Sequence, residues 1–116
     1  MAGEKAPGEV LAEISTELVK LHRRVYGRGP EKTKCFFADE TVICLLYGGL
    51  TVAERTLIAE GQTEAVHRLR RNAREAIEAP AKTIVEKASG RRVIAYMGEI
   101  HPDLDLTVEV FVREET

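Results

Sequence analysis

The sequence predicts an α+β fold, a two-layer domain in which two β-hairpins form a four-stranded antiparallel sheet with helices mainly on one face. Two long segments, 9–26 and 63–88, repeat apolar residues at three- and four-residue spacing, as helices packed on one side do. Each is followed by two short segments rich in β-branched and aromatic residues around a polar turn. This order, α-β-β-α-α-β-β, is also that of a pseudo-twofold α-β-β repeat.

Length and composition restrict the protein class. A chain of 116 residues is the size of one domain, and we expect residues 1–8 to be a flexible leader and residues 9–113 to be the domain. The net charge of -2 gives no overall attraction to nucleic acid, and the absence of Trp disfavours a stacking platform for single strands. No apolar run approaches the ~20 residues that span a bilayer, so we expect a cytoplasmic protein.

The first predicted helix ends at a glycine-rich turn. Its narrow apolar seam consists of Leu11, Ile14, Leu18, Leu21 and Val25. We expect this seam to pack against the sheet, or also against a second subunit. Gly27 and Gly29 follow the seam as helix-ending glycines, and Pro30 prevents continuation. Arg28 is thereby predicted to lie on a tight, exposed turn.

The first hairpin places the two cysteines opposite each other. If Asp39 and Glu40 form a two-residue turn between strands 32–38 and 41–47, Cys35 pairs with Cys44. A disulfide or a shared soft metal ion would fit that position, although two thiols are too few for a structural zinc site. The simpler interpretation is two reduced cysteines acting as small buried hydrophobes.

A short helix is predicted after Gly48 and Gly49. Thr51 and Glu54 have the spacing of a capping box, with Leu50 as the accompanying hydrophobic residue, and the helix stops at Gly61. A glycine-led helix N-terminus is also typical of anion sites. Because Glu54 already occupies the first turn, the sequence favours capping.

The long segment 63–88 carries the densest positive charge of the chain. Pro80 predicts a kink or break near Glu78, and the predicted buried face contains Val66, Leu69, Ala73, Ala76, Ile77, Ile84 and Val85. The positively charged cluster in the first half of this segment is either a solvated face or a docking patch for an acidic partner, RNA or anionic lipid. With Arg28, its candidate anion- or partner-binding residues are His67, Arg70, Arg71 and Arg74.

The second hairpin, strands 91–100 and 104–113, ends in a strongly alternating strand. We expect its more apolar side to face the core: Leu104, Leu106, Val108, Val110 and Val112. The other side is expected to be solvated, with Phe111 as an exception that covers an edge or meets a partner. An exposed sheet face or edge could also support a homodimer.

The sequence predicts no catalytic, metal or cofactor site. Its three histidines, His22, His67 and His101, have no metal-ligand spacing, and no nucleophile elbow, phosphate-binding loop or dinucleotide fingerprint occurs. We expect His22 to be a boundary residue beside the helix seam.

Several of these features together resemble the MpsC-like family of small bacterial proteins. They are Tyr26-Gly27-Arg28-Gly29-Pro30, the first hairpin, Gly48-Gly49-Leu50-Thr51 with Glu54, the arginine-rich helix and the final hairpin. The resemblance covers roughly residues 8–113. It implies association with a Na⁺-translocating system that generates a membrane potential, and it brings no defined catalytic residues.

Two function hypotheses follow. The first is a non-enzymatic cytoplasmic accessory or regulatory protein that docks, through a protein partner, on a membrane cation-transport complex. The second is a regulatory domain that binds a small ligand or nucleic acid through Arg28 or the arginine-rich cluster, with nucleic acid the weaker option at this net charge.

Overall fold

The computed structural model describes residues 5–115, which form four α-helices, one 3₁₀ helix and four strands. The elements are α1 (Pro7–Tyr26), β1 (Lys32–Ala38), β2 (Thr41–Tyr47), α2 (Val52–Ala59), α3 (Thr63–Asn72), α4 (Arg74–Ser89), β3 (Val93–His101), η1 (Pro102–Leu104) and β4 (Leu106–Arg113).

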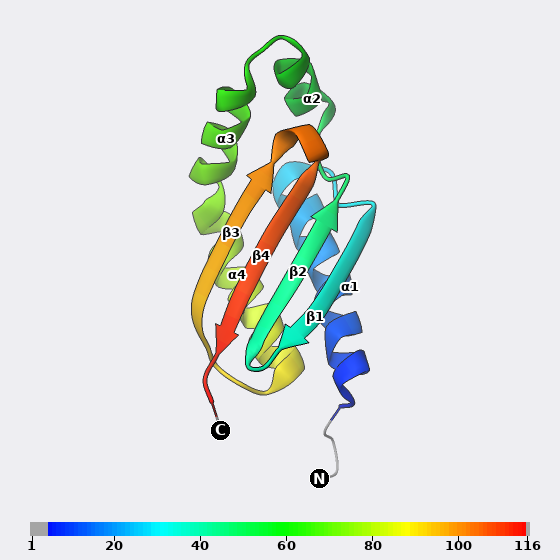
Figure 1. Cartoon of the computed structure of the whole chain (residues 1–116), viewed down its shortest axis with the longest axis vertical. Helices are drawn as coiled ribbons and strands as arrows, with labels where there is room; N and C mark the ends of the chain where they lie inside the picture. The colour runs from blue at the N-terminus through cyan, green and yellow to red at the C-terminus, as the bar shows by residue number, and fades with distance from the viewer. Residues whose placement is uncertain (1–4, 116) are drawn as a thin grey trace.

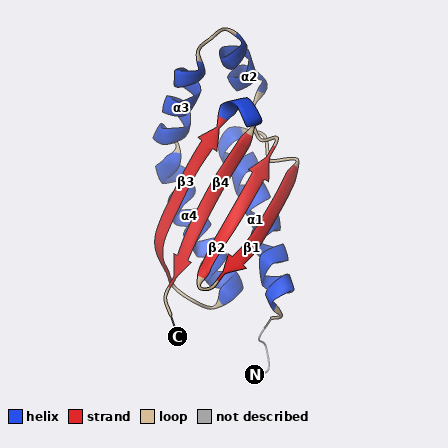
Figure 2. Cartoon of the chain, viewed as in Figure 1, coloured by secondary structure: helices blue, strands red, loops and turns tan. Residues whose placement is uncertain are grey.

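The four strands form one antiparallel sheet in the order β1-β2-β4-β3, which confirms the predicted fold class. The second strands of the two hairpins, β2 and β4, are therefore neighbours at the centre, as a pseudo-twofold repeat requires. Helices α1 and α4 lie behind the sheet, and α2 and α3 extend past its end (Figure 1). The opposite face of the sheet is turned toward the viewer, with no described helix across it (Figure 2).

The local signals of the first half explain its structure. Helix α1 begins at Pro7, two residues before the expected start, because proline is well tolerated in a first helical turn. Residues 1–4 of the expected leader lie outside the described residues. Gly27 ends α1 with φ of 83°, a left-handed conformation that favours glycine. The two-residue turn sets the hairpin register, and Cys35 lies directly opposite Cys44.

Of the kink or break expected near Glu78, the break is wrong. Helix α4 continues through Pro80, and the interruption lies at Ala73 between α3 and α4. Pro80 removes one backbone donor, but Ala76 is exposed, so water can reach the carbonyl left without it. The two helices on either side of this interruption pack against different elements, since α3 contacts α2 and η1 whereas α4 contacts α1 and β3.

The expected inward face of β4 is also wrong. Glu109, Phe111 and Arg113 are the buried residues of β4, and they face the helices. Val108 and Val110 face away from the helices and stay partly exposed. Hydrophobic alternation predicts the wrong inward face for β4, because the polar side chains of its inner face have internal partners. The more apolar face of the strand is left uncovered.

The main core lies between the sheet and helices α1 and α4. Its centre is completely buried around Ile14, Leu18, Val85 and Phe111. A smaller cluster of Leu50, Val66 and Ile100 holds α2 and α3 against the end of the sheet. The long-helix residues Leu69 and Ala76, which were expected to be buried, are exposed. The two clusters meet at a polar region, and the candidate site lies there.

Candidate functional site

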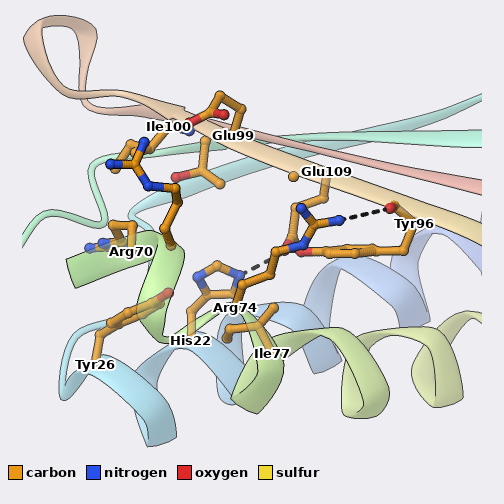
Figure 3. A pocket seen from close by; sticks show the side chains of 12 residues that line it. His22, Tyr26, Arg70, Arg74, Ile77, Tyr96, Glu99, Ile100 and Glu109 are labelled. Atoms are coloured by element: carbon orange, nitrogen blue, oxygen red, sulfur yellow. Dashed lines mark hydrogen bonds and ion pairs between the residues drawn. The ribbon is translucent and has the colours of Figure 1, made fainter. Parts of the chain in front are cut away.

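A cavity of about 130 Å³ opens between α1, the α3–α4 junction and the inner face of β3 and β4. Its polar lining side chains come from sequence segments that are far apart. Figure 3 shows them extending toward one another from the helices on one side and the sheet on the other. The charged and aromatic residues that line the cavity are His22, Tyr26, Arg70, Arg71, Arg74, Tyr96, Glu99 and Glu109.

Glu109 is a buried carboxylate with two partners. The Tyr96 hydroxyl donates to Glu109 Oε2 at 2.5 Å, and His22 Nε2 lies 3.4 Å from Glu109 Oε1. Burial, followed by the neighbouring Glu109 carboxylate, raises the pKa of Tyr96 well above its usual value. Gly98 makes room for this pair, because a Cβ there would lie 2.7 Å from the Tyr96 hydroxyl oxygen.

Arg70 forms the second polar wall through a buried bidentate ion pair. Its Nε and NH2 atoms each lie 2.6 Å from a carboxylate oxygen of Glu54. NH2 also donates to the Gly49 carbonyl at 3.2 Å, and the guanidinium lies 3.7 Å from the centre of the Tyr26 ring. The side chains of Arg70 and Glu54 are 8% and 1% exposed. This is the planar, stacked geometry for which Arg is suited and Lys is not.

Burial and pairing oppose each other in the pKa values of this pair. Burial is the largest single influence on Glu54 and raises its pKa, but hydrogen bonds from Arg70 and Thr51, together with the positive charge of Arg70, outweigh it, so the pKa is lowered. Burial likewise lowers the pKa of Arg70, and the hydrogen bond and charge of Glu54 reverse this to give a raised pKa. Both groups are therefore held in their charged forms.

The rim of the cavity is formed by more exposed charges. Arg71 pairs with Glu64 at 2.9 Å, and both side chains are largely exposed. Arg74 NH2 donates to the Tyr96 carbonyl at 3.2 Å, and Arg74 Nε lies 3.4 Å from Glu78. These contacts are weak enough in water for the rim arginines to exchange partners.

The residues predicted from sequence fall into two groups. Arg70, Arg71 and Arg74 line the cavity, and His67 lies near it, with Nδ1 3.8 Å from Glu99. Arg28 lies apart from the cavity-lining residues, where its Nε donates to the Gly48 carbonyl at 3.2 Å and NH2 pairs with Glu31 at 2.5 Å.

The predicted caps have structural roles. Thr51 Oγ1 accepts from the Glu54 amide at 3.1 Å, and Glu54 accepts from the Thr51 amide at 2.9 Å, which confirms the capping box. A Cβ at Gly29 would lie 2.9 Å from the Val19 carbonyl oxygen, so the chain approaches α1 closely there. Pro30 leads directly from this approach into β1.

Sequence reasoning did not identify the acidic floor of the cavity. The sequence predicts only that Glu109 and Tyr96 belong to strands and that His22 is a boundary residue, whereas all three side chains are buried and His22 is 5% exposed. One signal was present, since Gly98 interrupts an otherwise well-formed strand, and strand glycines often mark close approach of another group.

Within residues 5–115, no group of three or more His, Cys, Asp or Glu residues is placed to hold a metal ion. None of the helices in this range combines the length and apolar character needed to cross a membrane.

Residues 6–115 match the family described as "Na+-translocating membrane potential-generating system (MpsC)". The chain belongs to the MpsC family. A curated relative, described as uncharacterized protein YrhF of Bacillus subtilis (strain 168), is 25% identical over 103 residues, which cover 86% of this chain and 84% of the relative. No solved structure matches the chain.

Two segments that resemble the MpsC family meet at Arg70. Tyr26, the first residue of one segment, stacks on the Arg70 guanidinium, while Gly49 and Glu54 of the other accept its hydrogen bonds. In this MpsC-family chain, one side chain of the arginine-rich helix thus joins both glycine-rich segments and also forms a wall of the cavity.

Proposed function

We propose that this chain is a non-enzymatic, cytoplasmic accessory or regulatory component of a Na⁺-translocating system that generates a membrane potential. The observation that carries the proposal is the family match over residues 6–115, whose description names such a system. Arg70 and Glu109 are each engaged by internal partners, so the exposed rim of the cavity is the part that can reach a partner. Exposed Arg71 at its rim offers charge to a protein partner.

The test is recovery of the chain from its own cells. A tagged chain is isolated with detergent-solubilised membranes, and co-isolated proteins are identified by mass spectrometry. We expect subunits of a cation-transporting membrane complex to be enriched over a control with an unrelated tagged protein. Arg71→Gln should reduce this enrichment, and Arg68→Gln serves as the matched control, because Arg68 is exposed on the same helix. Equal recovery of transport subunits in the tagged and unrelated samples would contradict the proposal.

A second candidate function is binding of a small zwitterion, such as a small amino acid, in the cavity. The favouring observation is that groups of opposite charge line the cavity, with Glu109 contributed by β4 and Arg71 and Arg74 contributed by α3 and α4. Its volume of about 130 Å³ is below the range of drug-sized pockets, so the ligand would be small.

Thermal unfolding with small amino acids tests this candidate. Amines and carboxylic acids of the same size, which carry only one of the two charges, are the matched ligands. A ligand present at 100 times its Kd stabilises the folded state by about 2.7 kcal/mol. We expect a rise in Tm with the zwitterion alone and a smaller one in Arg71→Gln. Equal responses to all three ligand types would exclude the zwitterion site.

A further inference from the structure

The sheet face opposite the helices carries a continuous apolar surface. Each strand places alternate residues on it, and partners across neighbouring strands form rows. One central row consists of Phe36, Ile43, Val110 and Met97. Figure 1 looks directly onto this face, and no helix of residues 5–115 crosses it. Phe36 and Met97 are 38% and 51% exposed. We call the surface formed by the outward residues of the four strands the open face.

The composition of β4 shows how unusual the open face is. Val108 and Val110 point away from the helices, while Glu109 and Arg113 point toward them and are buried. The protein thus satisfies charged groups internally and leaves valines toward solvent. A monomer in water gains nothing from this arrangement, because apolar surface removed from water contributes about 25 cal/mol per Å². The outward position of these valines is explained if a partner covers the open face.

The charges at the edges of the open face indicate what covers it. The row beside the apolar one begins with Lys34 on edge strand β1, passes through Leu45 and Val108, and ends with Glu99 on edge strand β3. If a second copy packs on this face about a twofold axis parallel to the strands, β1 of one copy lies over β3 of the other. Lys34 then faces Glu99 of the second copy, and the contact occurs twice. An axis across the strands would bring like edges together instead.

We propose that the open face binds a second copy of this chain, giving a homodimer in which two sheets pack face to face. Two sheets stacked about 10 Å apart with aligned strands form an ordinary sandwich core. Val108, Val110, Ile43 and Leu45 lie at its centre, and Lys34 and Glu99 close its sides. A self-complementary patch of this kind is what a twofold interface requires. The apolar rows of the open face lie on the opposite side of the sheet from the cavity, and of the interface residues named here only Glu99, on edge strand β3, also lines the cavity. A monomeric wild-type chain would therefore overturn the dimer without bearing on the proposed function.

Molar mass in solution tests the dimer. Light scattering after size-exclusion chromatography should give twice the chain mass of 12.9 kDa. Val110→Lys places a charge at the centre of the interface and should give a monomer, while circular dichroism confirms that the monomer is folded. The wild-type chain remaining monomeric at high concentration would overturn the proposal and leave the face free for a different protein.

Charge reversal tests the orientation. Lys34→Glu and Glu99→Lys alone should each weaken dimerisation about tenfold or more, because like charges would then face each other. The double variant Lys34→Glu/Glu99→Lys should restore the dimer. Lys20→Glu, on the exposed side of α1, is the matched control and should leave the dimer unchanged. A double variant that is folded and as weakly associated as the two single variants would exclude the twofold axis parallel to the strands.

Discussion

Arg70 and Glu54 form a bidentate ion pair, with both nitrogen–oxygen distances at 2.6 Å, in which the two side chains are almost completely buried. Glu54 also closes the capping box of α2, so one carboxylate both starts a helix and neutralises the neighbouring arginine. Burying charge is costly unless every polar group is paired. The contacts with Gly49 and Tyr26 complete that pairing and fix the wall of the cavity.

Removing the arginine should therefore destabilise the protein strongly. Arg70→Ala leaves Glu54 buried without its partner, and we expect the free energy of unfolding to fall by about 3–5 kcal/mol. Urea denaturation measures this. Arg68→Ala is the control, because Arg68 is exposed on the same helix and its loss should change stability by less than about 0.5 kcal/mol. Equal losses in the two variants would contradict the role given to Arg70.

The same pair should make stability depend on acidity. The folded-state pKa of Glu54 is lowered from the ordinary value of 4.5, so the unfolded chain binds the proton more readily. The stabilisation is therefore fully present above about pH 4.5 and is lost as pH falls through the folded-state pKa. Denaturation of wild type and Glu54→Gln between neutral and acidic pH tests this. The difference in stability between them should shrink on acidification, and a constant difference would contradict it.

The hydrogen bond between Tyr96 and Glu109 should also contribute measurably. Tyr96→Phe removes the hydroxyl that donates to Glu109 Oε2 and leaves that oxygen unsatisfied, which typically costs about 1–3 kcal/mol. Tyr47→Phe is the matched control, since Tyr47 lies on the open face and is only half-buried. Chemical denaturation of both variants decides the matter, and a cost at Tyr96 no larger than at Tyr47 would refute the assignment.

The cysteine pair should react unevenly. The thiols are free, and the hydrogen bond from Cys44 lowers the pKa of Cys35, while that interaction and burial raise the pKa of Cys44. Because the thiolate is the nucleophile, we expect Cys35 to be alkylated first in the native protein. Mass spectrometry during alkylation measures this. Faster reaction at Cys44 would contradict the prediction, as would a disulfide, seen as the loss of two hydrogen atoms.

Local signals allowed most of the fold to be predicted. The capping residues Thr51 and Glu54 and the turn at Asp39 each depend on neighbours in sequence, and each is found as expected. These features set the two hairpins and hence the sheet.

The long-range features could not be predicted in this way. The orientation of β4 depends on whether Glu109 and Arg113 find partners inside, and those partners, Tyr96 and the Glu40 carbonyl, are on other elements. The break at Ala73 depends on the different attachments of α3 and α4. Of the cavity, only the arginines were identified, because positive charge is visible in sequence whereas a buried carboxylate on an apolar strand is not.

The membrane potential of the cells that contain this chain tests the central claim most directly. A deletion strain and the same strain complemented with the wild-type chain are compared with a potential-sensitive dye in Na⁺ and K⁺ media. A component of a Na⁺-translocating system should be needed for the full potential in Na⁺ medium, with little effect in K⁺ medium, and complementation should restore it. An identical potential in both strains in Na⁺ medium would contradict the proposed function.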